Sequence, residues 1–146
     1  CNGAVDDGIL IDSNPACAAH TFLGSIAGDA GAEQVGAASF DEQFYRVTVR
    51  EDSGSTVPLL ARVVLVPPAG ADFDLYVYCA SCGGVLAGSS TLPVGVTETV
   101  DVGRDDGLGD QTYDLLIEVR FVSASACGTW QLTVTGNVPN PNRACN

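Results

Sequence analysis

The sequence predicts an all-β fold, an antiparallel β-sandwich or jelly-roll-like structure stapled by disulfide bonds. From Thr21 onward, apolar side chains recur at every second position, which is the period of a half-buried strand. Clusters of Gly, Pro, Asp and Ser separate these stretches, and no 11-residue stretch shows a helical period. Six cysteines in 146 residues, an even number, indicate a disulfide framework made in an oxidising compartment.

Each predicted strand rests on this alternation. In residues 43–50, Tyr45, Val47 and Val49 face one way while Arg46 and Thr48 face the other. The same pattern recurs in residues 58–66, 73–79, 96–102, 113–122 and 129–136. The inward positions give the predicted core: Leu23, Tyr45, Val47, Val63, Leu65, Leu75, Val77, Val100, Ile117, Val119, Trp130, Leu132 and Val134.

The two ends of the chain lack this alternation. We expect an irregular N-terminal arm at residues 1–19, a sandwich domain at 20–137 and an extended C-terminal tail at 138–146. The chain starts at Cys1 without a signal peptide or Met, so we expect a processed or excised piece. A lipid-modified Cys1 is the alternative, but it would leave an odd number of cysteines for disulfide bonds.

The composition argues against most catalysis. The chain has no lysine, which removes Schiff-base chemistry, and its single histidine, His20, leaves almost no general base near neutral pH. A Ser-His-Asp site would need His20, which lies beside the irregular arm. We therefore expect no catalytic residues and no enzyme.

The charge and hydropathy limit the partners. A net charge of −12 repels phosphate backbones and anionic membranes, so we expect no nucleic-acid partner. No apolar run reaches the roughly 18 residues that span a bilayer, so we expect no membrane span. Such a surface suits calcium, basic partners or salty water, or it serves solubility alone.

Four segments of the chain resemble a known family. These are residues 23–31, 44–52, 66–79 and 117–137, and their strongest elements are residues 74–78 and 130–134. Together they resemble the bacterial pre-peptidase C-terminal domain, and more narrowly the disulfide-bearing version in secreted proteins of myxobacteria and relatives. The resemblance implies a β-sandwich appendage of secreted proteases and other extracellular proteins, some of which bind calcium or extracellular polymers such as collagen. We expect this chain to depart from that usual setting, without an attached enzyme.

The loop at residues 103–114 is the predicted metal site. Asp105, Asp106, Asp110 and Asp114 supply hard oxygen ligands in a Gly-rich segment that could wrap a calcium ion. The spacing is not that of an EF-hand. The alternative is an acidic hairpin loop whose aspartates bond the turn backbone.

All six cysteines are expected to be oxidised, although six cysteines allow 15 pairings. Cys79 and Cys82 form a CxxC motif, which here indicates a static disulfide because no helix lowers a thiol pKa for redox work. We expect the pairs Cys1–Cys17 and Cys79–Cys82. Cys127–Cys145 then follows by elimination.

Tyr76 and Tyr78 are the predicted binding residues. They are aromatic residues on the polar face of their strand, and exposed tyrosines anchor peptides, glycans or a neighbouring subunit. The alternative is a second packed layer beneath a loop or the N-terminal arm.

Two functions remain open. The first is a non-catalytic binding or targeting module of a secreted bacterial protein, whose partner is an extracellular protein or polysaccharide. The second is a structural subunit of an extracellular filament or surface assembly, self-associating through strand edges and the N-terminal arm. Both place the protein outside the cell or at its surface.

Overall fold

The structure is a computed structural model that describes residues 17–53, 56–107 and 109–146. The predicted arm lies outside these residues except for Cys17–Ala19, which form the single-turn 3₁₀ helix η1. The strands are β1 (Thr21–Ala27), β2 (Gln34–Ser39), β3 (Gln43–Arg50), β4 (Leu59–Val66), β5 (Ala71–Cys79), β6 (Leu86–Ser90), β7 (Glu98–Arg104), β8 (Tyr113–Ala124) and β9 (Trp130–Gly136).

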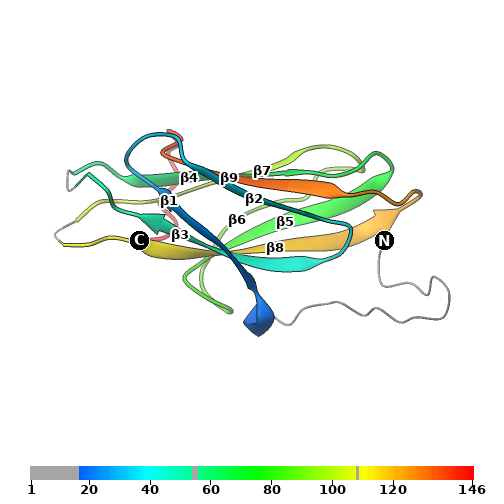
Figure 1. Cartoon of the computed structure of the whole chain (residues 1–146), viewed down its shortest axis with the longest axis horizontal. Coiled ribbons are helices and arrows are strands. Elements are labelled where there is room, and N and C mark those ends of the chain that lie inside the picture. Colours follow the sequence, from blue (N-terminus) through cyan, green and yellow to red (C-terminus); the bar gives the residue numbers. More distant parts are fainter. Residues whose placement is uncertain (1–16, 54–55, 108) are drawn as a thin grey trace.

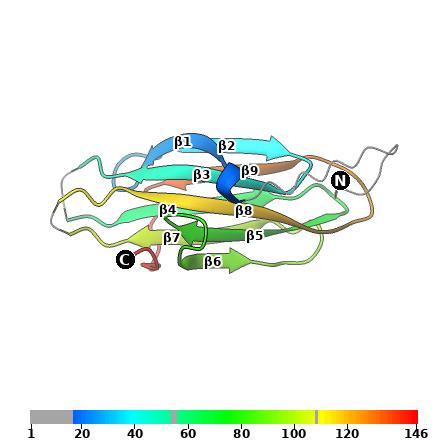
Figure 2. The same cartoon turned by 90° about the horizontal axis from the view of Figure 1, so that it is seen from below.

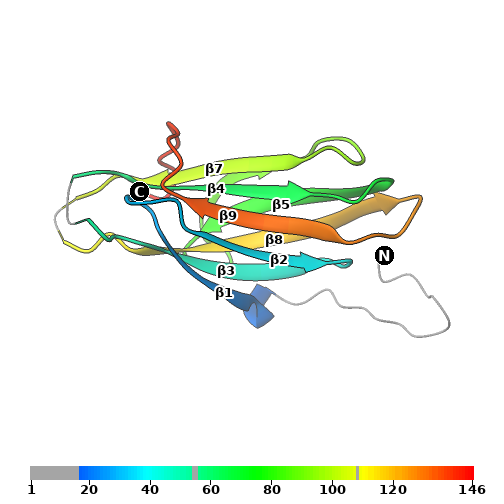
Figure 3. The same cartoon turned by 45° about the horizontal axis from the view of Figure 1, so that its top comes forward.

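The strands form two sheets packed face to face (Figure 1). One sheet has the order β1-β3-β8-β5-β6, and its outer face is seen in Figure 2. The other has the order β2-β9-β4-β7 and faces the viewer in Figure 3. The predicted fold class, an all-β sandwich, is confirmed.

One strand pair departs from the expected antiparallel pattern. β1 and β3 pair in parallel, with Thr21 opposite Tyr45 and Ala27 opposite Arg50. The reason is that β2, which lies between them in sequence, crosses to the other sheet. Two chain reversals therefore bring β3 back beside β1 in the same direction.

The alternating apolar side chains meet between the sheets and form one core. Every predicted core residue is buried except Leu23, which is partly buried because β1 is an edge strand with an irregular register between Phe22 and Gly24. Trp130 is the largest fully buried side chain and packs edge-to-face against Tyr45 and Phe73 at centroid distances of 6.0 and 6.5 Å. Its indole N–H donates to the Asp41 carbonyl at 3.0 Å.

The expected disulfide pairings are wrong. Cys17 bonds Cys82, and Cys79 bonds Cys145, so none of the three expected pairs forms. Cys127 is disulfide-bonded as well, and Cys1 lies outside the described residues.

The geometry of the β5–β6 turn explains why Cys79 and Cys82 do not pair. A side chain at Gly84 would approach the Cys79 carbonyl oxygen to 2.0 Å, so this tight turn requires glycine. Cys79 continues the inward alternation of β5 and packs against the core, whereas Cys82 is exposed in the turn. The two sulfur atoms therefore point to different sides of the sheet, and each reaches a segment distant in sequence.

The C-terminal tail contains no strand and packs along β7 and β6. The Cys145 N–H donates to the Gly103 carbonyl, and Asn140 Nδ2 donates to the Val102 carbonyl. Asn142 Nδ2 reaches the Ala87 carbonyl at 3.2 Å. These contacts and the Cys79–Cys145 bond make the tail part of the folded unit.

Candidate functional site

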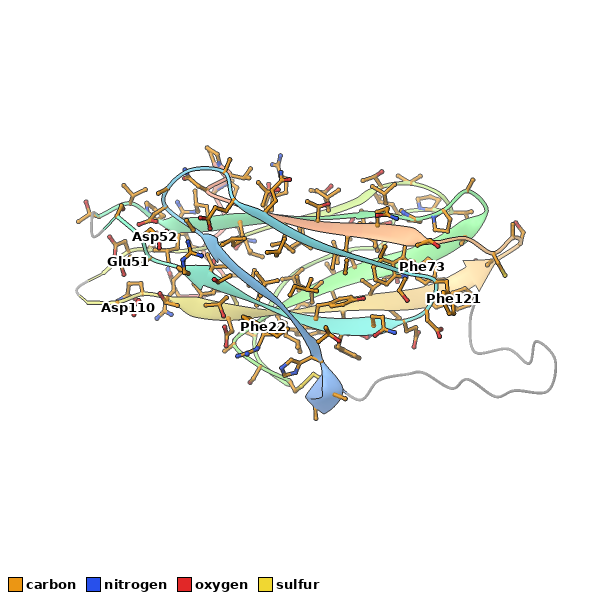
Figure 4. All side chains as sticks on the ribbon, viewed as in Figure 1. Phe22, Glu51, Asp52, Phe73, Asp110 and Phe121 are labelled. Carbon is orange, nitrogen blue, oxygen red and sulfur yellow. A yellow bond between two sulfur atoms is a disulfide. The ribbon has the colours of Figure 1, made fainter. Side chains whose placement is uncertain are left out.

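Several acidic side chains lie on the loops at one end of the sandwich, which we call the acidic end. Figure 4 shows Glu51, Asp52 and Asp110 together at that end, on the β3–β4 and β7–β8 loops. At the other end, residues 91–97 and 122–129 carry no charged side chain, and exposed Leu92 and Val94 lie there. Asp41 and Glu42, on the β2–β3 loop, also lie at this other end, where the Phe121 N–H donates to Glu42 Oε1. Both ends of the sandwich therefore carry acidic side chains.

The four aspartates of the predicted calcium loop have different partners. Asp105 accepts bonds from Arg143 and from the Asn146 side chain, and these hydrogen bonds lower its pKa. Asp110 accepts the Thr112 N–H, and Asp114 accepts bonds from Arg46 and Thr48 on the neighbouring strand.

Asp106 differs from these three, since its Oδ1 atom is buried without a hydrogen bond. No three His, Cys, Asp or Glu side chains come together as a metal site in the part of the chain described here. Calcium binding stays a prediction that a comparison of thermal melting in excess calcium and in chelator would test.

Asp29 organises the acidic end. Its buried carboxylate accepts the N–H groups of Asp52 at 3.1 Å and Ser53 at 2.9 Å, and the Ser53 hydroxyl at 2.5 Å. Burial raises the pKa of Asp29, but these hydrogen bonds outweigh it and hold the pKa below its ordinary value of 3.8. The charged form is therefore the one that fastens the β3–β4 loop to the β1–β2 turn.

We expect Asp29→Asn to destabilise the fold in a pH-dependent way. A depressed folded pKa gives stability that is present above the unfolded pKa and lost as pH falls through the folded pKa. The variant should therefore be less stable than the wild type at pH 7, and the difference should shrink below about pH 3.8. Urea unfolding of both proteins at pH 7 and pH 3 measures this, and equal differences at the two pH values would contradict it.

The outer face of the five-stranded sheet carries most of the exposed and half-buried aromatic rings of the described chain. Alternation on β3, β8 and β5 directs every second side chain outward, and the register aligns Phe44 with Glu118 and Glu118 with Tyr76. The outward side chains on these strands include Phe44, Arg46, Thr48, Arg50, Asp114, Leu116, Glu118, Arg120, Asp74, Tyr76 and Tyr78. β1 adds exposed Phe22, which is labelled in Figure 4.

A hollow of about 270 Å³ opens on this face. The Cys17–Cys82 disulfide lies at its rim, because it pins η1 against the β5–β6 turn over this side of the sheet. The hollow is mostly apolar, and the residues that line it are Cys17, Phe44, Tyr78, Gly83, Leu116 and Glu118. We call this feature the aromatic hollow.

The polar groups of the aromatic hollow are already paired. Tyr78 donates its hydroxyl to Glu118 Oε2 at 3.0 Å, and Arg120 Nε donates to Glu118 Oε1 at 2.9 Å. Burial and the bond to Glu118 raise the pKa of Tyr78, so its hydroxyl stays a donor at neutral pH. The hollow thus presents ring surfaces around a neutralised carboxylate.

Two arginines lie over rings beside the hollow. The Arg46 guanidinium lies 4.6 Å from the Phe22 centroid, and that of Arg120 lies 4.3 Å from the Tyr76 centroid. Such contacts hold the rings and the cations in place. The face is therefore built from fixed planar groups, which lose little entropy when a partner binds.

The structure separates the two predicted binding tyrosines. Tyr78 lines the hollow, whereas Tyr76 lies under Arg120 and bonds Asp74, and both are half-buried. The sequence reasoning did not name Phe44 or Leu116 as binding residues, and it named Cys17 only as a disulfide cysteine. An outward apolar residue at 116 in an otherwise polar series was the available signal, but it has no meaning without the strand order β3-β8-β5.

His20 makes a local contact. Its Nδ1 atom lies 3.1 Å from the Cys17 carbonyl oxygen, beside η1. Within the described residues no helix is long and apolar enough to cross a membrane.

The chain was compared with family models, with curated protein sequences and with solved structures. No family model matches the chain, and no curated protein sequence matches it. Among solved structures, it is similar to the pre-peptidase C-terminal domain of collagenase from Bacillus anthracis, with 10% identity and a TM-score of 0.46. The match covers 79% of this chain and 95% of that domain. This neighbour carries the name of the family that the sequence resembles.

Proposed function

We propose that the chain is a non-catalytic binding module of an extracellular protein, and that it holds its partner on the outer face of the five-stranded sheet. The aromatic hollow carries this proposal, because it is a mostly apolar concavity with rings on its wall and a disulfide at its rim. The disulfides suit an oxidising location outside the cell.

The chemistry of the face indicates the kind of partner. The net charge of −12 repels acidic polymers, and the carboxylate in the hollow is already satisfied by Tyr78 and Arg120. A neutral or basic extended segment of a protein or polysaccharide therefore fits, with an apolar or ring-shaped group seated against Phe44 and Tyr78. Tyrosine and phenylalanine provide contact area with few rotatable bonds.

Substitutions in the hollow test the proposal. Tyr78→Ala and Phe44→Ala should each weaken binding to immobilised gelatin or microcrystalline cellulose about tenfold or more, as loss of a central aromatic anchor does. Tyr78→Phe keeps the ring and loses only the bond to Glu118, so it should lose less. Binding isotherms at fixed protein concentration give these ratios.

The control is Val64→Ala, a half-buried outward position on β4 in the other sheet. It should bind like the wild type, and all variants should keep a cooperative thermal transition. An equal loss of polymer binding in Val64→Ala and Tyr78→Ala would overturn the proposed location of the binding face. The same conclusion would follow if the double variant Tyr78→Ala/Phe44→Ala still bound both polymers like the wild type.

A structural role in an extracellular assembly is the second candidate. The observation that favours it is an uncharged edge strand, β2, in a strongly acidic chain. The N-terminal arm was also expected to take part, but residues 1–16 lie outside the described residues. Deletion of these residues, followed by light scattering and a thermal melt, tests the arm separately.

A further inference from the structure

The four edge strands of the sandwich differ in how they are protected against pairing with another chain. β1 has an irregular register at Phe22 and Gly24, and the Gly24 φ is +127°. β6 is five residues long, and the tail residue Asn142 bonds its Ala87 carbonyl. β7 carries charged side chains, and the tail occupies its last carbonyls. Bulges, short length, charge and cover are the usual protections of an edge.

β2 has none of these protections among the described residues. Its sequence is QVGAAS, without charge or proline, and its register with β9 is unbroken from Gln34 to Ser39. Figure 3 shows it as the outermost strand of its sheet. The outward side chains at 34, 36 and 38 are exposed, and two of them are Gly and Ala, which allow another backbone to approach closely.

The register shows which backbone groups of β2 are free for another strand. Gly136 N–H donates to the Glu33 carbonyl, so residues 33, 35, 37 and 39 face β9. The hydrogen bond from Asn137 N–H to the Leu60 carbonyl is consistent with this assignment. It shows that the alternate residues of β9, those that do not bond β2, bond β4 instead. The N–H and C=O groups of Gln34, Gly36 and Ala38 therefore point away from the sheet.

We propose that β2 of a second copy pairs antiparallel with this strand across a two-fold axis at Gly36. The contact joins the two four-stranded sheets into one continuous sheet. Outward-facing residues then form the hydrogen-bonded pairs: Gly36 meets Gly36 of the second copy, and Gln34 meets Ala38 in both directions.

The side chains fit this two-fold register. Gly36 meets Gly36 on the axis, and the pairs on either side of it each join a larger residue with a small one. Gln34 lies opposite Ala38, and exposed Phe40 lies towards Ala32 of the second copy. The charged residue nearest to the strand, Glu33, is in an ion pair with Arg50 at 2.9 Å. No unpaired like charges therefore face each other along the β2 contact.

The charge of the chain favours this edge over the acidic surfaces. Two copies with a charge of −12 each repel one another, so self-contact needs an uncharged surface, and β2 provides one. Two six-residue strands bury less area than a standard interface, so we expect a weak dimer with a dissociation constant of about 100 µM. The contact is isologous and closes at two copies, so it does not by itself build a filament.

A charge-exchange experiment tests the contact and its register. Sedimentation equilibrium of the full chain, from about 10 µM to about 1 mM, should fit a monomer–dimer equilibrium. Gln34→Glu/Ala38→Glu places like charges opposite each other twice and should raise the dissociation constant about tenfold. Gln34→Glu/Ala38→Lys places opposite charges there and should restore the wild-type value or tighten it.

Thr99→Glu on the exposed β7 edge is the matched control, and it should leave the dimer unchanged. A wild type that stays monomeric at about 1 mM would overturn the proposal. Equal dimerisation of the Gln34→Glu/Ala38→Glu variant would place the contact elsewhere, and an open-ended polymer would exclude the two-fold arrangement. These measurements do not involve the aromatic hollow, so they are independent of polymer binding.

Discussion

Trp130→Ala is expected to lower the free energy of unfolding by about 3–5 kcal/mol. Trp130 is fully buried, so its loss leaves a cavity between the sheets. The substitution also removes the edge-to-face contacts with Tyr45 and Phe73. The Asp41 carbonyl loses its indole donor, which adds the cost of a buried unsatisfied group.

Denaturant unfolding monitored by circular dichroism measures this effect, with disulfides intact. Trp130→Phe is the control, because it keeps an aromatic ring in the core but removes the N–H donor. It should cost less than the alanine variant. A loss below about 1 kcal/mol for Trp130→Ala would contradict a core centred on this residue.

Cys79→Ala/Cys145→Ala is expected to destabilise the fold by about 4 kcal/mol. The bond joins residues 66 positions apart, and loop-closure entropy for a loop of this size gives about that value. Cys145 is also buried against the core, so the substitution frees the tail from β7 and β6. We therefore expect both a lower unfolding free energy and a protease-accessible tail.

The matched variant is Cys17→Ala/Cys82→Ala, which opens a loop of nearly the same size, with a separation of 65 residues. It should lose similar stability but keep the tail protected, because Cys17 and Cys82 lie at the other face. Urea unfolding and limited proteolysis at Arg143 separate the two outcomes. A tail equally protected in both variants would contradict the role of the Cys79–Cys145 bond.

Alternation made the sheets predictable. A period of two fixes which side chains share a face, and the predicted inward positions of β3, β4, β5, β8 and β9 are buried as expected. Cys79 belongs to the inward series of its strand, and this position indicated a disulfide on the core side of the sheet. The expected Cys79–Cys82 pair was instead based on the short CxxC spacing, and it was wrong.

Contacts between residues far apart in the chain could not be predicted from the sequence. The aromatic hollow needs β8 between β3 and β5, and no local pattern fixes strand order. Buried acids were also unexpected: Asp29 binds the N–H groups of another loop, and fully buried Glu98 accepts the Leu92 N–H at 2.8 Å. Both carboxylates accept hydrogen bonds from loops that approach them only in the folded chain.

The structure thus places two surfaces on different sheets. The aromatic hollow lies on the outer face of the five-stranded sheet, and the uncharged β2 edge belongs to the four-stranded sheet. If both act as proposed, one copy can hold a polymer while it contacts a second copy. Two linked sites would then bind a repetitive polymer more tightly than one site.

The most direct test of the binding face is an NMR titration of the isotope-labelled chain with soluble gelatin peptides and with cellohexaose. We expect amide shifts that cluster at Phe44, Tyr78, Gly83, Leu116 and Glu118, around the aromatic hollow. The same peaks should not shift in Tyr78→Ala at equal ligand concentration. Shifts that cluster on the outer face of β9 and β4 instead, or no shifts with either probe, would contradict the proposed binding face.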